Sequence, residues 1–137
     1  MIVARPVPSV DDDELLARFI VNQNEFRPGD NTVKPKLFLP YRYVDLSVNR
    51  HRDSDTEELW QVGAAVAQSR KRSLYGRADI KAGTCRIGSL DVLQKPHFPE
   101  NPNHADITGF PAAKEDQMSL AQKLADSARH RIPPPGG

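Results

Sequence analysis

The chain has 137 residues, of which 38% are hydrophobic, and its 19 basic and 18 acidic side chains give a formal net charge of +1. This length suits a single domain, because domains typically hold about 50–250 residues. The balanced charge argues against a dedicated nucleic-acid-binding role, since such proteins use a surplus of basic side chains to neutralise phosphates.

The first 50 residues predict one helix and two strands. Residues 1–10 contain Pro6 and Pro8 and are expected to be extended. The acidic run 11–14 suits the positive end of a helix dipole, and the apolar residues that follow have helical spacing, so a short helix is predicted. Strands are predicted at 36–39 and at 44–48, where apolar and polar residues alternate.

The rest of the chain predicts two helices and three strands. One helix begins at Ser54, which has capping-box spacing to Glu57, and ends at the basic run 70–72. The other helix covers 113–129. Between them the patterns predict strands at 76–81, across 85–87 and 90–93, and at 104–110, with a turn at Gly83 and a Pro-rich loop over 95–103.

This element order predicts an α+β fold in a single small domain, with a mixed sheet and two or three helices. It is compatible with a β-grasp-like sheet. We expect an extended segment at 1–10, the domain at 11–131 and a flexible Pro-Pro-Pro-Gly-Gly tail at 132–137.

The tail offers the first functional interpretation. A backbone that passes through a narrow enzyme channel cannot carry a Cβ at the constricted positions, which Gly136 and Gly137 satisfy. On these two residues the chain resembles the ubiquitin-like modifiers. The resemblance implies a carrier that is not itself an enzyme and needs no cofactor. Its Gly137 carboxylate would be activated and conjugated in a bacterial-type pathway, with an activating enzyme, a conjugating enzyme and a removal protease as partners.

Two alternatives stay open beside the carrier. The same tail also fits an ordinary loose chain end. In that case the body of the chain, which has no recognised nucleotide, hydrolase or redox motif, is a small non-enzymatic accessory or interaction domain that partners a larger effector. Residues that could form its partner surface are Trp60, Arg70, Arg72 and Arg131.

The second alternative is a small His-dependent metal enzyme. Two imidazoles and a carboxylate are able to hold a metal ion, and His97 and His104 flank the Pro-rich loop, with His51 elsewhere. Their spacing matches no recognised ligand motif, so no metal site is assigned.

The cellular location is inferred from three features. Cys85 is the single cysteine and cannot form an internal disulfide, which favours a reducing compartment. There is no apolar run of the about 18 residues that a membrane span needs, and no secretory signal at the start. We therefore expect a cytoplasmic protein without a membrane partner.

Overall fold

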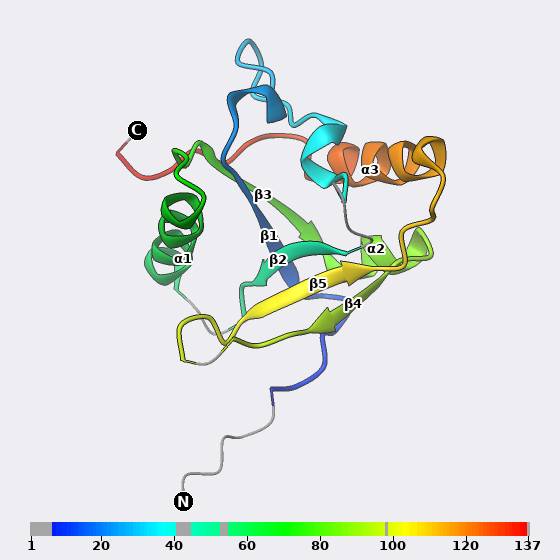
Figure 1. Cartoon of the computed structure of the whole chain (residues 1–137), viewed down its shortest axis with the longest axis horizontal. Helices are drawn as coiled ribbons and strands as arrows, with labels where there is room; N and C mark the ends of the chain where they lie inside the picture. Colours follow the sequence, from blue (N-terminus) through cyan, green and yellow to red (C-terminus); the bar gives the residue numbers. More distant parts are fainter. Residues whose placement is uncertain (1–6, 41–44, 53–54, 98, 137) are drawn as a thin grey trace, which may run out of the picture.

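The computed structural model describes residues 7–40, 45–52, 55–97 and 99–136. Within these residues the strands form one antiparallel sheet in the order β3-β1-β2-β5-β4. They are β1 (Leu15–Ile20), β2 (Leu46–Arg50), β3 (Gly76–Lys81), β4 (Asp91–Gln94) and β5 (His104–Thr108). The helices are α1 (Thr56–Ser69), α2 (Ala82–Ile87) and α3 (Lys114–Ala128), with 3-10 turns η1 (Gln23–Glu25) and η2 (Pro35–Phe38). The predicted α+β class is confirmed (Figure 1).

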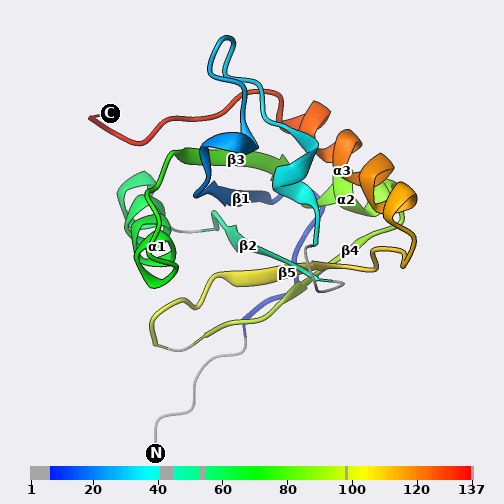
Figure 2. The same ribbon diagram turned by 45° about the horizontal axis from the view of Figure 1, so that its top comes forward.

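The helices lie on two sides of the sheet (Figures 1 and 2). On one side, α2, α3 and η2 cover a large apolar core that draws side chains from every strand, including Leu16, Val48, Ile80, Val92 and Ile107. On the other side, α1 makes a smaller cluster with β1, built from Ala17, Phe19 and Leu59. The apolar contacts of α1 on this side therefore reach β1 and leave the β2–β5–β4 part of the face without a helix packed on it.

The predicted helix after residue 14 is wrong, because residues 15–20 form the central strand β1. Leu16, Ala17, Phe19 and Ile20 are all buried, since a core lies on each face of this strand. A strand buried on both faces has apolar residues in succession and lacks the alternation that marks a half-buried strand.

Three further predictions need correction. Residues 35–38 form η2 and not a strand at 36–39, because Pro35 stands at its first position, where a fixed φ suits a helix. Residues 85–87 belong to the short helix α2 and not to a strand. The sheet is antiparallel at all four pairings among the described residues, so it is not mixed in strand direction.

The other predicted elements are confirmed with small shifts. The strands at 44–48, 76–81, 90–93 and 104–110 correspond to β2, β3, β4 and β5, and the last helix corresponds to α3. Asp55 caps α1, because its carboxylate accepts a hydrogen bond from the Glu58 amide at 2.7 Å. The predicted cap Ser54 lies outside the described residues, as do residue 44 of the predicted strand 44–48 and residues 1–6 of the expected N-terminal extension. No helix in the described part of the chain is both long and apolar enough to cross a bilayer.

Part of the expected N-terminal extension is packed against the domain. The guanidinium group of Arg50, which is 1% exposed, donates to the carbonyls of Pro8 and Ser9 at 2.7 and 3.3 Å. It also binds the Glu14 carboxylate at 2.9 Å, and Val10 is 4% exposed. Burial of Glu14 opposes its ionisation, but the hydrogen bond from Arg50 prevails and the pKa of Glu14 is lowered. Residues 8–14 are therefore held on the fold by one buried cation.

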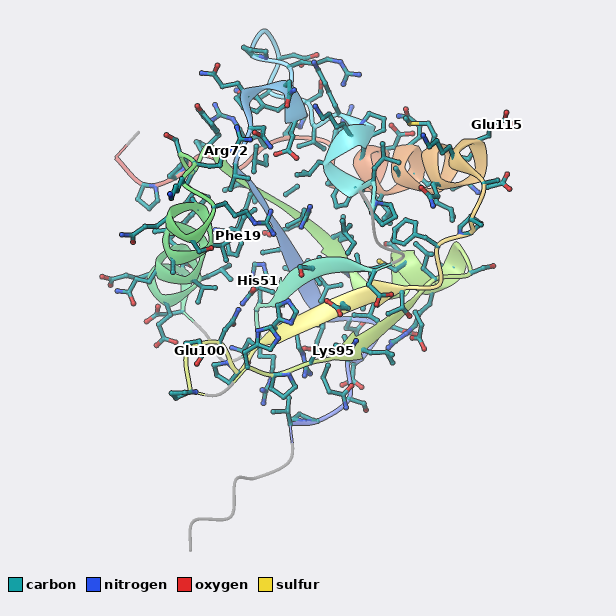
Figure 3. The ribbon with its side chains drawn as sticks, viewed as in Figure 1. Phe19, His51, Arg72, Lys95, Glu100 and Glu115 are labelled. Atoms are coloured by element: carbon teal, nitrogen blue, oxygen red, sulfur yellow. The ribbon has the colours of Figure 1, made fainter. Side chains whose placement is uncertain are left out.

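A glycine sets the distance between α1 and β1. A Cβ on Gly63 would lie 2.7 Å from two ring carbons of Phe19, which Figure 3 shows between α1 and the sheet. The side chain of Phe19 is 8% exposed and has little room to move. Gly63 therefore allows the helix to lie directly on the Phe19 ring.

The Gly63→Ala substitution is expected to destabilise the fold by up to about 2 kcal/mol, because overpacking costs about 1–3 kcal/mol and alanine recovers about 1 kcal/mol of helix propensity. Chemical denaturation of the variant and the parent measures this difference. Gly29→Ala is the matched control, since nothing lies within 4 Å of a Cβ at Gly29. Equal stabilities of the two variants would show that Phe19 does not restrict α1.

Candidate functional site

Polar side chains of β2 and β5 share the sheet face on which α1 packs. Leu46 and Val48 of β2 enter the large core, so the alternate residues Ser47 and Asn49 lie on the opposite face. In the register of the two strands, Ser47 stands opposite Asp106 and Asn49 stands opposite His104. Four polar residues are thus gathered on the part of the face that has no helix packed on it.

Strands β1 and β2 diverge next to these residues, and the Arg18 side chain lies in the opening between them. Strands β1 and β2 are paired only at Leu16–Arg50 and Ala17–Asn49. Beyond that point the guanidinium group of Arg18 bridges the chain segments: Nη1 donates to the Ser47 carbonyl at 2.9 Å and Nε donates to the Leu37 carbonyl at 3.1 Å. A cation therefore satisfies the Ser47 carbonyl of β2 and the Leu37 carbonyl of η2.

The tip of the β4–β5 hairpin folds over the same face. His97 and Asn101 exchange backbone hydrogen bonds at 2.9 and 2.6 Å, which closes the tip. The side-chain amides of Asn101 and Asn49 bind each other in both directions, at 2.8 and 3.2 Å. The His97 ring stacks on His104 with centroids 4.2 Å apart and planes 20° apart. In Figure 3, Lys95 and Glu100 mark the start and the tip of this connection.

A cavity of about 200 Å³ opens between α1, β2 and the hairpin tip. Its polar lining includes Arg18, Ser47, Arg70, His97, Asn101 and His104, and none of the described residues that line it is acidic. Burial lowers the pKa of the Arg18 guanidinium to about 10, and the nearby charge of Arg70 acts in the same direction, while Glu25 opposes it. The cavity therefore holds two mutually repelling cations without an acidic partner in its wall. We call it the Arg18 cavity.

The hydrogen bonds of His104 define its tautomer. Nδ1 lies 3.0 Å from the Lys95 carbonyl oxygen, which is able only to accept, so Nδ1 carries the proton. In the neutral ring Nε2 is then an acceptor, and it lies 3.1 Å from the Ser47 hydroxyl, which must donate to it. Burial lowers the pKa of His104 below its ordinary value of 6.5, with the Lys95 carbonyl opposing the shift. The ring is therefore neutral at pH 7.

Two charged groups, Asp106 and Lys95, lie near the hydrogen-bonded pair of His104 and Ser47. Asp106 Oδ1 lies 3.8 Å from Nε2 of His104, and its Oδ2 lies 3.3 Å from the Lys95 ammonium group. The side chains of His104 and Asp106 are each 13% exposed. A proton taken up by His104 would therefore be partly compensated by Asp106.

The three histidines of the metal hypothesis do not form one group, because His51 binds Asp79 while His97 stacks on His104. His51 Nε2 binds Asp79 at 3.0 Å, and Arg77 binds the same carboxylate at 3.1 Å. Burial opposes ionisation of Asp79, but hydrogen bonds from His51 and Arg77 lower its pKa. No group of three or more His, Cys, Asp or Glu side chains in the described residues is placed to hold a metal ion.

The predicted partner surface is only partly exposed. Trp60 is 8% exposed, with the Arg77 guanidinium 4.8 Å from its ring centre, so little of its side chain is available to a partner. Arg131 donates to the Tyr75 carbonyl at 2.6 Å and to Asn31 at 3.0 Å, which gives it a structural role. Arg70 and Arg72 are exposed, and of these two only Arg70 lines the cavity.

The C-terminal segment is anchored before it leaves the domain. Ile132 and Arg77 exchange backbone hydrogen bonds at 2.9 and 3.0 Å, so Ile132 lies against the edge strand β3 and is not part of a free tail. Pro133 and Gly136 are exposed, and nothing lies within 4 Å of a Cβ at Gly136, whose φ is +74°. Gly137 lies outside the described residues.

Cys85 is buried in α2 with no exposed surface. Burial raises the pKa of its thiol to about 12, against the opposing charge of Arg86. The thiol therefore stays protonated, and Cys85 acts as a small core residue.

Comparisons with protein-family models, curated proteins and solved structures give no match to this chain. Among the residues of the site the sequence pointed to His97, His104 and Arg70. Ser47 and Arg18 were missed, because their roles come from the strand register and from the separation of β1 and β2.

We expect the His104 ring to be the Nδ1-protonated neutral tautomer at pH 7 and to gain its second proton only below pH 6.5. Long-range 1H–15N spectra of the histidine rings, followed through a pH titration, report both properties. Ser47→Ala should keep this tautomer, because the Lys95 carbonyl still accepts from Nδ1. An Nε2-protonated ring at pH 7 would contradict the arrangement.

Proposed function

We propose that this chain is a small interaction domain that binds an anionic group, a phosphate or a carboxylate, in the Arg18 cavity. The observation that carries the proposal is a cavity lined by two arginines and two histidines without an acidic residue among its described walls. The domain would act beside a larger partner that carries the anion. We also propose that it acts in the cytoplasm, where the free thiol of Cys85 is kept reduced.

The electrostatics of the cavity favour an anion over a neutral group. Arg18 is partly buried, and its pKa is lowered because water is lost around the charge and Arg70 repels it. An anion between the two guanidinium groups would reverse both effects. Asn101 and Ser47 line the same space and add neutral polar groups beside the cations.

Arg70→Gln is expected to weaken the binding of inorganic phosphate by about tenfold, because one charge-assisted hydrogen bond contributes about 1.5 kcal/mol. Calorimetric titration with sodium phosphate at constant ionic strength measures the dissociation constant, and a parallel titration with sodium acetate separates phosphate from carboxylate recognition.

Arg72→Gln is the matched control for this experiment, since it removes the same charge from an exposed residue outside the cavity lining. Its dissociation constant should stay within about twofold of the parent, as expected for a screened surface charge. Equal losses in both variants would mean that overall charge, and not the cavity, attracts the anion.

The carrier is the second candidate function, and the geometry of the C-terminal segment favours it. The backbone is fixed at Ile132 on the edge of β3, and the chain leads away from this anchor to Gly136, with Pro133, Pro135 and Gly136 exposed (Figure 1). The space around Gly136 is open. An enzyme channel that accepts only glycine would therefore reach Gly136 without unfolding the domain.

If the chain is a carrier, trypsin will cut after Arg131 and leave Ile-Pro-Pro-Pro-Gly-Gly attached to the lysine of a target. Mass spectrometry of lysine peptides from native cells that express the tagged chain should find this remnant. A chain that lacks Gly137 should give none. The same yield of remnant-bearing peptides from both chains, or none from either, would contradict the carrier.

A further inference from the structure

We propose that the Arg18 cavity is also a catalytic site, in which Ser47 is a nucleophile and His104 is its general base for the hydrolysis of an ester. The inference rests on the proposed function, since the anion-binding cavity would hold the substrate. The interaction that points to it is the hydrogen bond from the Ser47 hydroxyl to Nε2 of His104 at 3.1 Å.

The direction of this hydrogen bond is the first argument. The Lys95 carbonyl requires a proton on Nδ1, so the lone pair of Nε2 faces the Ser47 hydroxyl. A nucleophile that donates to a neutral imidazole, which is oriented in turn by a third group, is the arrangement used for serine activation. Here a backbone carbonyl takes the place of the orienting carboxylate.

The residues around Ser47 and His104 hold the imidazole ring in place and bring a positive charge close to Ser47. The ring of His97 stacks on His104 and limits its rotation. The Arg18 guanidinium is hydrogen-bonded to the carbonyl of Ser47, which places a cation beside the residue where negative charge would develop. The titratable groups next to His104 are His97, Asp106 and Lys95 on its own hairpin, and Arg18 and Arg70 line the same cavity.

The reaction balances with water as the only co-reactant. Ser47 Oγ forms a bond to the ester carbonyl carbon and gives its proton to Nε2 of His104. The bond from that carbon to the leaving oxygen breaks, and His104 returns the proton to the alcohol that departs. Water then attacks the acyl group on Ser47, passes a proton through His104 to Oγ, and the carboxylic acid is released.

The experiment uses the intact chain with two probes. A fluorophosphonate should form an adduct on Ser47, located by peptide mass spectrometry, and 4-nitrophenyl acetate should be hydrolysed. Ser47→Ala should lose the adduct and the turnover. His104→Gln should slow the reaction by about 100-fold or more, which is the usual contribution of a general base. The rate of the parent should fall as the pH drops below 6.5 and His104 gains a proton.

Ser73→Ala is the control, because Ser73 is exposed and lies outside the cavity lining. Its adduct and turnover should match the parent. Labelling that persists in Ser47→Ala, or a parent that forms no adduct although its far-ultraviolet spectrum shows it folded, would overturn the catalytic assignment.

The phosphate titration separates the two proposals. If the parent binds phosphate but forms no adduct, the interaction domain stands and the nucleophile does not. If Ser47 is labelled but phosphate does not bind, catalysis stands and the anion-binding proposal fails.

Discussion

The insertion of Arg18 between β1 and β2 is the constraint on which the rest of the site depends. Where β1 and β2 diverge, the Ser47 carbonyl of β2 accepts from the Arg18 guanidinium group, which also donates to the Leu37 carbonyl of η2. The separation also makes room for the cavity over β2. The same side chain therefore closes the sheet and brings a positive charge into the wall of a polar cavity, at the cost of removing that charge from water.

One face of the sheet packs against the main core, and the other face carries the polar residues of the candidate site. The face under α3 collects one set of alternate residues from β2 and β5, such as Val48 and Ile107, into the main core. The other set includes Ser47 and His104, which line the Arg18 cavity together with residues of α1 and of the hairpin tip. Because the main core lies on the opposite face, these polar groups are not required for apolar packing. Their hydrogen bonds satisfy one another while the cavity beside them stays open.

Whether the residue pattern of a segment predicts its structure depends on which of its faces are buried. Alternation identified β2 and β3, because each has one face in the main core and polar residues on the other. It failed at β1, where burial on both faces produces the run of apolar residues that was interpreted as a helix. The short segment at η2 has too few residues for any periodicity, and the position of Pro35 carries the helical signal.

For the site, the sequence identified the histidines but not their chemistry. His97 and His104 flank the hairpin loop, and their proximity follows from the pairing of β4 and β5. The partner of His104 is Ser47, which is distant in the sequence and comes close only through the register of β2 and β5. A small metal enzyme was one alternative for these histidines, although their spacing matched no ligand motif. The Lys95 carbonyl and the Ser47 hydroxyl instead occupy both ring nitrogens of His104, so that a metal ion would have to displace one of these hydrogen bonds.

The C-terminal segment and the Arg18 cavity lie on different parts of the sheet. Ile132 covers the edge strand β3, whereas the hairpin that closes the cavity belongs to β4 and β5 at the opposite edge. An exposed edge strand invites pairing with other chains, so the backbone hydrogen bonds of Ile132 protect the fold in their own right. The segment thus has a structural part that ends at Ile132, and only the residues after it are free to serve a carrier. For that reason the binding and carrier proposals do not compete for the same residues, and each is open to test without disturbing the other.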